Sequence, residues 1–179
     1  MDLVARFNGC PLSDIAGGAK RDRIKLYGSA GMYMKPERFA EEALAITGMG
    51  FQAYKMRTAR GPEEDLEAVQ KMRSAVGADI GLMIDAHSWW RMGNKTYSPE
   101  TILNLANAMA EFHPTWLEEP LPPENHEAYS KLKEKAKFPI DNWNDVGKPY
   151  LSTRGWCEFC IKIAQHDMEN LGRLLSVSE

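Results

Sequence analysis

Two short apolar segments end in carboxylates: Leu82-Met83-Ile84-Asp85-Ala86-His87 and, about thirty residues later, Leu117-Glu118-Glu119-Pro120-Leu121. An unbroken apolar run is typical of a parallel strand covered on both faces, and acids at its end are typical of a site at the C-terminal mouth of such strands. A carboxylate there is costly unless a cation or another partner compensates for its lost hydration. The two segments therefore predict that Asp85 and Glu118 share a divalent cation. For each acid alone, a solvated strand end or a helix cap is the alternative interpretation.

Outward from these segments, the chain alternates between strand and helix patterns. Alternating apolar and polar residues predict a strand over 51–57, and Pro36, Pro62 and Ser98-Pro99 stand where helices favour proline and a capping serine. The predicted strands are 24–28, 51–57, 80–85, 115–118 and one that begins at 138, and the predicted helices between them are 36–47, 61–76, 98–111 and 126–137. Alternation of this kind without hairpin signals predicts βαβ units and a parallel sheet.

The acids at successive strand ends favour a parallel (β/α) barrel of the TIM type over a doubly wound sheet, which is expected to carry a glycine-rich phosphate turn. A complete barrel has eight strands in about 250 residues. This chain of 179 residues offers about five strands. We therefore predict an incomplete barrel over residues 23–140, a preceding linker over 1–22, and a divergent tail, a loop plus a helix, over 141–179.

The tail and the last predicted strand set two further expectations. Apolar residues recur at helical spacing from Gly155 to Leu175, which predicts a helix there. The sheet is expected to have an open edge after the strand at Phe138. Unpaired strand edges invite association, so we expect a homo-oligomer or association with another chain through that edge.

Composition excludes several classes of function. The net charge of -3 and the lack of a basic run interleaved with aromatic residues argue against nucleic-acid binding. No apolar stretch approaches the roughly 20 residues of a membrane span, and no apolar region of a signal peptide follows Met1. The sparse cysteines Cys10, Cys157 and Cys160 fit a reducing compartment. Cys157-x-x-Cys160 has the spacing of a redox motif, but its helical pattern favours packing, and we expect a cytoplasmic protein.

Three motifs follow one another in an order and spacing that resembles the enolase superfamily, specifically its mandelate racemase-like acid-sugar dehydratases: Lys55-Met56-Arg57, Asp85-Ala86-His87 and Trp116-Leu117-Glu118-Glu119-Pro120. The resemblance covers about residues 2–140. It implies a barrel that holds Mg²⁺ with one acid from each of three successive strands. Asp85 matches the first of these acids and Glu118 the second, and both are therefore expected to bind the metal.

The resemblance also implies that Lys55, Arg57 and His87 are catalytic. Lys55 and Arg57 match the family's Lys-x-Lys pair, whose second member is usually the base. An arginine stays protonated at ordinary pH, so Arg57 suits carboxylate binding better than proton abstraction. His87 matches a histidine acid of some acid-sugar dehydratases, a role that suits a group titrating near working pH. The alternatives are an ion pair at a strand end for Lys55 and Arg57, and a purely hydrogen-bonding histidine for His87.

This sequence departs from the family pattern at the third acid. The family places a Gly-Glu pair about four residues after Ile140, where this chain has Asn144 beside Asp145. The family's later strands, its His/Asp dyad and its N-terminal capping domain are also not found, so we expect a fragment, a splice form or a misread gene product.

The implied function is that of a magnesium-dependent dehydratase, a lyase acting on small acid sugars through an enediolate intermediate. The isolated chain is expected to be weakly active or inactive. One alternative is a non-enzymatic fragment or splice form that associates with another chain. The other is a different divalent-metal barrel enzyme, such as an aldolase.

Overall fold

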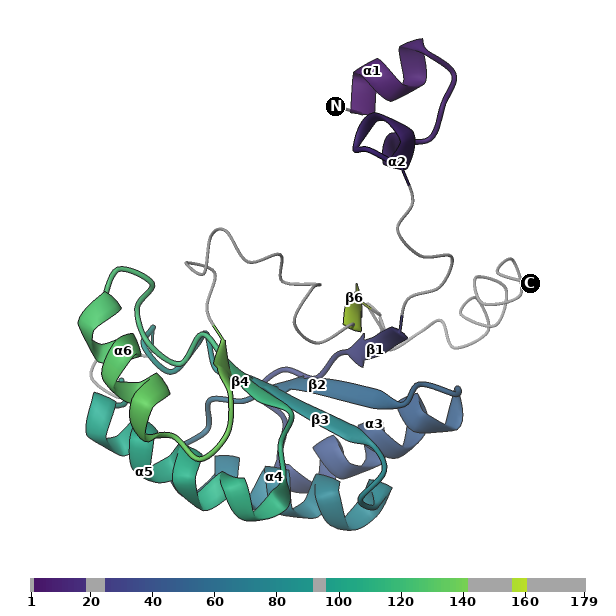
Figure 1. The fold of residues 1–179 in the computed structure, drawn as a ribbon. Coiled ribbons are helices and arrows are strands. Elements are labelled where there is room, and N and C mark those ends of the chain that lie inside the picture. Colours follow the sequence, from purple (N-terminus) through teal and green to yellow (C-terminus); the bar gives the residue numbers. More distant parts are fainter. Residues whose placement is uncertain (1, 19–24, 92–95, 142–155, 161–179) are drawn as a thin grey trace.

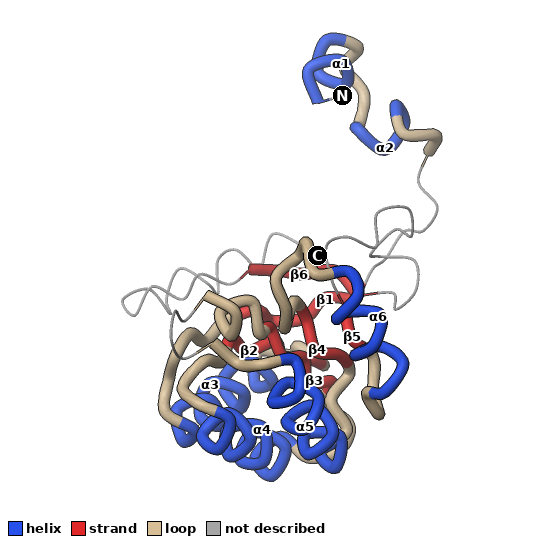
Figure 2. The backbone as a smooth tube through the Cα atoms, turned by 90° about the vertical axis from the view of Figure 1, so that its left-hand side faces the viewer, coloured by secondary structure: helices blue, strands red, loops and turns tan. Residues whose placement is uncertain are grey.

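The computed structural model describes residues 2–18, 25–91, 96–141 and 156–160. Its centre is a six-stranded sheet with the strand order β5-β4-β3-β2-β1-β6, in which every pair of neighbouring strands is parallel. Figure 1 shows α3, α4 and α5 side by side along the sheet, and Figure 2 shows them as an outer layer around the strands. The predicted architecture, part of a (β/α) barrel of the TIM type, is confirmed.

The elements follow the predicted alternation. The strands are β1 (Lys25–Ser29), β2 (Ala53–Arg57), β3 (Gly81–Asp85), β4 (Trp116–Glu118), β5 (Ile140–Asp141) and β6 (Trp156–Cys160). The helices are α1 (Asp2–Phe7), α2 (Leu12–Ile15), α3 (Pro36–Gly48), α4 (Pro62–Val76), α5 (Pro99–Met109), the 3₁₀-helix η2 (Ala110–Phe112) and α6 (His126–Lys135). Ser98 caps α5 as predicted, because its side chain accepts a hydrogen bond from the Thr101 amide at 3.1 Å.

Buried residues lie on both faces of the sheet. The larger core joins the outer face of the strands to the helices, with fully buried side chains such as Phe39, Ile46, Met72, Leu82 and Ile84. The smaller core lies on the inner face and contains Tyr27, Ala53, Met83 and Trp116, one residue from each of four adjacent strands. The charged residues at the strand ends lie next to this layer, and layers of side chains stack in the same way inside a complete barrel.

The segment before β1 forms two short helices. Figures 1 and 2 show α1 and α2 together, away from the sheet. Leu3 and Phe7 on α1 are strongly exposed. Among all the helices that the structure describes, none has the length and the apolar character needed to cross a membrane.

The tail differs from the sequence prediction. Residues 156–160, predicted to be helical, form β6, which pairs with β1 in register from Lys25–Trp156 to Ser29–Cys160. Without β6, β1 would be an edge strand with unpaired backbone groups, and Trp and Phe are residues that favour strands. Pairing with β1 therefore overrides the helical spacing at this point. The rest of the predicted helix, and the loop before it, lie outside the described residues. The predicted open edge is present among the described strands, where β5 pairs only with β4.

Packing of β1 against α3 gives a prediction for Gly28. A Cβ atom at Gly28 would lie 2.4 Å from Cγ2 of Ile46, which is fully buried and stiff because it branches at Cβ. We expect Gly28→Ala to lower the free energy of unfolding by about 1–3 kcal/mol through overpacking, as measured by urea denaturation.

Gly48, at the end of α3, provides the matched control. A Cβ atom there would meet nothing within 4 Å, so Gly48→Ala is expected to be neutral or to stabilise by up to about 1 kcal/mol. Equal urea midpoints for the two variants would contradict the close approach of β1 to α3.

Candidate active site

β2, β3 and β4 end in one row of charged residues. The sheet register pairs Arg57 with Asp85 and Asp85 with Glu118. Paired residues of neighbouring strands share a face of the sheet, and side chains alternate along each strand. Lys55, two residues before Arg57, therefore projects to the same face. The structure therefore places Lys55, Arg57, Asp85 and Glu118 on one face of the sheet, at the C-terminal ends of β2, β3 and β4.

The ammonium of Lys55 lies between the two acids. Its Nζ is 3.1 Å from each carboxylate oxygen of Glu118 and 3.6 Å from Oδ2 of Asp85. The exposed fractions of the three residues are 1% for Lys55, 5% for Asp85 and 7% for Glu118. Neither acid is a solvated strand end, since each is buried and paired with a cation.

Asp85 is the most heavily contacted acid of the row. Its Oδ2 lies 3.2 Å from Nε of Arg57, and its Oδ1 lies 2.7 Å from Nδ1 of His87 and accepts a 3.2 Å hydrogen bond from the His87 amide. The structure thus contains the ion pairs that were the alternative interpretation of Lys55 and Arg57. These ion pairs hold the four side chains together at the ends of the strands.

The two acids respond differently to burial. Burial alone would raise the pKa of Asp85, but the hydrogen bond from His87 and the charge of Lys55 hold that pKa below its usual range. Burial raises the pKa of Glu118, although the nearby charge of Lys55 opposes the shift. Asp85 is therefore the more firmly ionised of the two carboxylates.

Sequence reasoning missed the partners on the far side of His87. Ser88 Oγ lies 3.3 Å from His87 Nε2 and 2.5 Å from the hydroxyl of Tyr33. Tyr33, on the loop between β1 and α3, has a φ of 55°, which is unusual for a residue with a side chain. Asp85 contacts one side of the imidazole ring, and Ser88, which is itself bound to Tyr33, contacts the other. No motif marks Tyr33 as a partner of Ser88.

A second missed residue, Asp65, holds together the loops that follow β2 and β3. Asp65 is 1% exposed and accepts hydrogen bonds from the Thr58 hydroxyl, from the Arg60 amide at 3.0 Å and from the Tyr97 hydroxyl at 2.7 Å. Trp89 packs against Tyr97 with 5.0 Å between ring centroids. Asp65 thereby ties the first turn of α4 to the segment that follows His87.

The third metal ligand is expected near Asn144 or Asp145. Asn144 and Asp145 lie outside the described residues. The register instead pairs Glu118 with Asp141. Ile140 belongs to the outer core, so the next residue, Asp141, faces the side of Glu118. Among the described residues, no three His, Cys, Asp or Glu side chains gather closely enough to hold a metal.

The donors that are present can still suit magnesium. Mg²⁺ usually keeps several waters and takes one or two protein carboxylates. Asp85 and Glu118 supply hard oxygen donors, and one ammonium group contacts both of them. The residues therefore fit a magnesium ion bound by two carboxylates and water.

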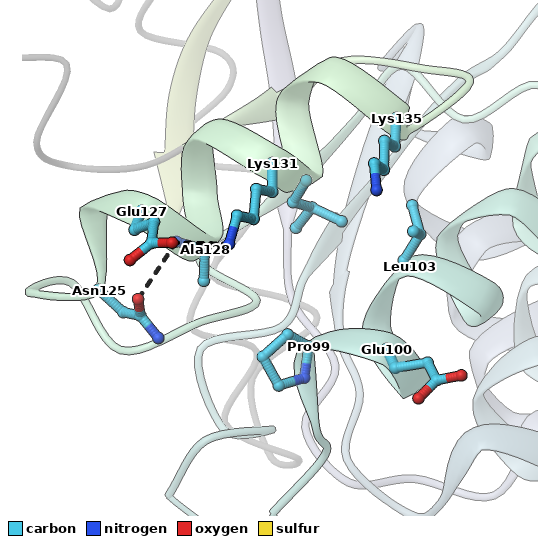
Figure 3. Close-up of a pocket in the computed structure, with 9 residues that line it drawn as sticks. Pro99, Glu100, Leu103, Asn125, Glu127, Ala128, Lys131 and Lys135 are labelled. Carbon is cyan, nitrogen blue, oxygen red and sulfur yellow. Dashed lines mark hydrogen bonds and ion pairs between the residues drawn. The ribbon is translucent and has the colours of Figure 1, made fainter.

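A pocket elsewhere on the surface is separate from this row. It has a volume of about 460 Å³ and lies between α5 and α6, where Pro99, Leu103, Ala128 and Lys135 are among its lining residues (Figure 3). Its lining contains none of the strand-end residues. Lys131, also in the lining, pairs with Glu127 at 2.6 Å. This pocket carries no group that the chemistry of the row requires.

The charge of the row gives a pH-dependent prediction at Glu119. Burial, and then the charges of Asp85 and Glu118, raise the pKa of Glu119 from its usual 4.5 to about 6. The folded chain keeps this proton to a higher pH than the unfolded chain. We therefore expect the wild type to lose thermal stability relative to Glu119→Gln as the pH rises from about 4.5 to about 6.

Glu127 is the control for that comparison. It is an exposed acid on α6 whose pKa is lowered from 4.5 by its hydrogen bond with Lys131, so Glu127→Gln should melt in parallel with the wild type above pH 4.5. If Glu119→Gln and the wild type also run in parallel across this window, the charge repulsion inferred at Glu119 is wrong.

Comparison with known proteins gives consistent matches. The chain is 29% identical to D-gluconate dehydratase of Thermoproteus tenax over 187 residues, covering 96% of this chain and 35% of that protein. The crystal structure of 3,6-anhydro-D-galactonate cycloisomerase from Zobellia galactanivorans matches with a TM-score of 0.65 and 33% identity, covering 74% of this chain and 35% of that one. D-glucarate dehydratase from Agrobacterium tumefaciens, solved with magnesium, matches with a TM-score of 0.64 and 29% identity over 73% of this chain and 35% of that one.

These relatives share a fold but differ in activity. Other solved structures that match include a putative mandelate racemase and a dipeptide epimerase. The chain spans about a third of the length of the relatives it matches. The family model described as Enolase C-terminal domain-like matches residues 38–143, more than half of the 179 residues. The chain therefore belongs to this family of the enolase superfamily and comprises part of its mandelate racemase-like barrel.

Proposed function

We propose that this chain carries part of the active site of a magnesium-dependent lyase that dehydrates small acid sugars. The observation that supports this most directly is the convergence of Asp85 and Glu118 on the ammonium of Lys55, with His87 held on Asp85 at 2.7 Å. Dehydratases of gluconate and glucarate among the matching proteins support the substrate class.

In this proposal Asp85 and Glu118 hold the metal ion. When bound, such an ion supplies a Lewis acid beside the substrate carboxylate, where negative charge grows as the neighbouring proton leaves. Arg57 offers a planar guanidinium suited to a carboxylate, and Lys55 adds a second cation 3.6 Å from Asp85. Because Arg57 remains protonated, it binds and orients the substrate, and the base that accepts the substrate proton is assigned to a part of the active site other than this strand-end row.

His87 is proposed as the acid that assists the departing hydroxyl. Its Nδ1 faces Asp85, and its Nε2 is 3.3 Å from Ser88 Oγ, so Nε2 is the ring nitrogen that would exchange a proton with the substrate. The carboxylate of Asp85 keeps the ring in one orientation. The side chain of His87 is 26% exposed, which leaves room for a substrate to approach it.

A second candidate function is association without catalysis. Among the described strands β5 pairs on one side only, and an unpaired edge favours association with another strand. We propose that the isolated chain associates through this edge and gives no measurable dehydration. A missing base or acid typically costs roughly 10²–10⁴-fold in rate.

Magnesium titration of the full chain tests the metal assignment. We expect weak binding by isothermal titration calorimetry that is lost in Asp85→Asn and in Glu118→Gln, because each change removes one of two carboxylate ligands. Glu124→Gln, at an exposed acid before α6, should bind like the wild type. Unchanged binding in Asp85→Asn would contradict the site.

Turnover and assembly are measured on the same samples. Incubation with magnesium and a panel of aldonate and aldarate sugars, followed by an assay for 2-keto acids, is expected to show no product. Size-exclusion chromatography is expected to show oligomers. A monomer that releases 2-keto acid, with turnover abolished by Asp85→Asn, would contradict both expectations.

A further inference from the structure

The point at which Asp85 and Glu118 converge already contains a positive charge, the ammonium of Lys55. We infer that Lys55 competes with the divalent cation for these carboxylates, so that metal binds only when the ammonium leaves Glu118. This inference rests on the proposed metal site and adds a second role for Lys55, that of the residue that sets metal affinity.

The ammonium of Lys55 and a metal ion bound to Glu118 would lie close together. Lys55 Nζ donates to both carboxylate oxygens of Glu118, at 3.1 Å each. A magnesium ion lies about 2.1 Å from a ligand oxygen. An ion on either oxygen of Glu118 would therefore be no farther than roughly 5 Å from an unmoved Nζ, the sum of the two contacts. Like charges at that separation repel.

The burial of Lys55 strengthens the repulsion between its ammonium and a metal ion. Lys55 is 1% exposed, so solvent and salt screen this repulsion far less than they would at the surface. The charges of Lys55 and Arg57 already balance those of Asp85 and Glu118, because the four form one set of ion pairs. A divalent ion that approaches Asp85 and Glu118 therefore encounters carboxylates whose charges are already neutralised.

The inner face of the sheet offers the displaced ammonium a neighbour. Lys55 Nζ lies 5.7 Å from the centroid of the Tyr27 ring, within the range of a cation–π contact. A change of side-chain rotamer at Lys55 that keeps the ammonium near Tyr27 is the motion that this inference requires.

The test is direct metal binding by three forms of the full 179-residue chain: wild type, Lys55→Met and Lys131→Met. Lys131 is the matched control because its ammonium also pairs with a glutamate, at 2.6 Å, but at the surface. Free Mn²⁺ is followed by electron paramagnetic resonance, with Mg²⁺ as competitor. We expect Lys55→Met to bind at least about tenfold more tightly than the other two forms, since one close positive charge is gone.

The outcomes separate this inference from the proposed function. Equal affinity in the wild type and in Lys55→Met, with binding abolished by Asp85→Asn, would overturn the competition and leave the metal site intact. Weaker binding by Lys55→Met would overturn it as well. Absence of binding in all three forms would refute the metal site itself.

A measurement on the wild type covers the case in which Lys55→Met does not fold, since removal of Lys55 takes away the buried cation that lies between Asp85 and Glu118. The chain is labelled with acetic anhydride with and without saturating Mn²⁺, and the labelled peptides are quantified by mass spectrometry. Labelling of Lys55 is expected to rise severalfold with metal, while that of Lys131 stays constant. No change at Lys55 under saturation would overturn the inference.

Discussion

The parallel register of β2, β3 and β4 is the constraint on which the site depends. It places Arg57, Asp85 and Glu118 in one row and Lys55 one pleat below, so four charged side chains share a buried space. Such a space is tolerable only if the charges neutralise one another. The groups that pair in this structure are also those to which the proposed function assigns the metal ion and the substrate carboxylate.

The parts of the fold and site that sequence could predict are those fixed by local patterns. Prolines and a capping serine indicated where helices begin. Apolar runs that end in acids indicated that Asp85 and Glu118 lie at strand ends. The features that could not be predicted from the sequence depend on contacts between distant segments of the chain. Strand β6 pairs with the edge of β1. Tyr33 contacts Ser88, which lies 55 positions later in the chain. The position of Asp141 beside Glu118 can be recognised only from the register between β4 and β5.

Family membership and partial length together shape what the chain can do. The matching proteins are about three times longer, and they include dehydratases, cycloisomerases and epimerases. The matched part of this chain carries the strand-end acids Asp85 and Glu118 and the lysine–arginine pair of β2. Under the proposed function these groups bind a metal ion and a carboxylate, and among the described residues His87 is the candidate for moving a proton.

The pairing of β1 with β6 has a consequence for the order in which the chain folds. Every other pair of neighbours in the sheet joins consecutive strands, whereas β1 ends at Ser29 and β6 begins at Trp156. Closing so long a loop costs more entropy than closing the short ones, and pairing between distant segments is slow. During synthesis β1 can pair with β2 long before its other neighbour has left the ribosome. Until then the outer edge of β1 presents unpaired backbone groups that can associate with other chains.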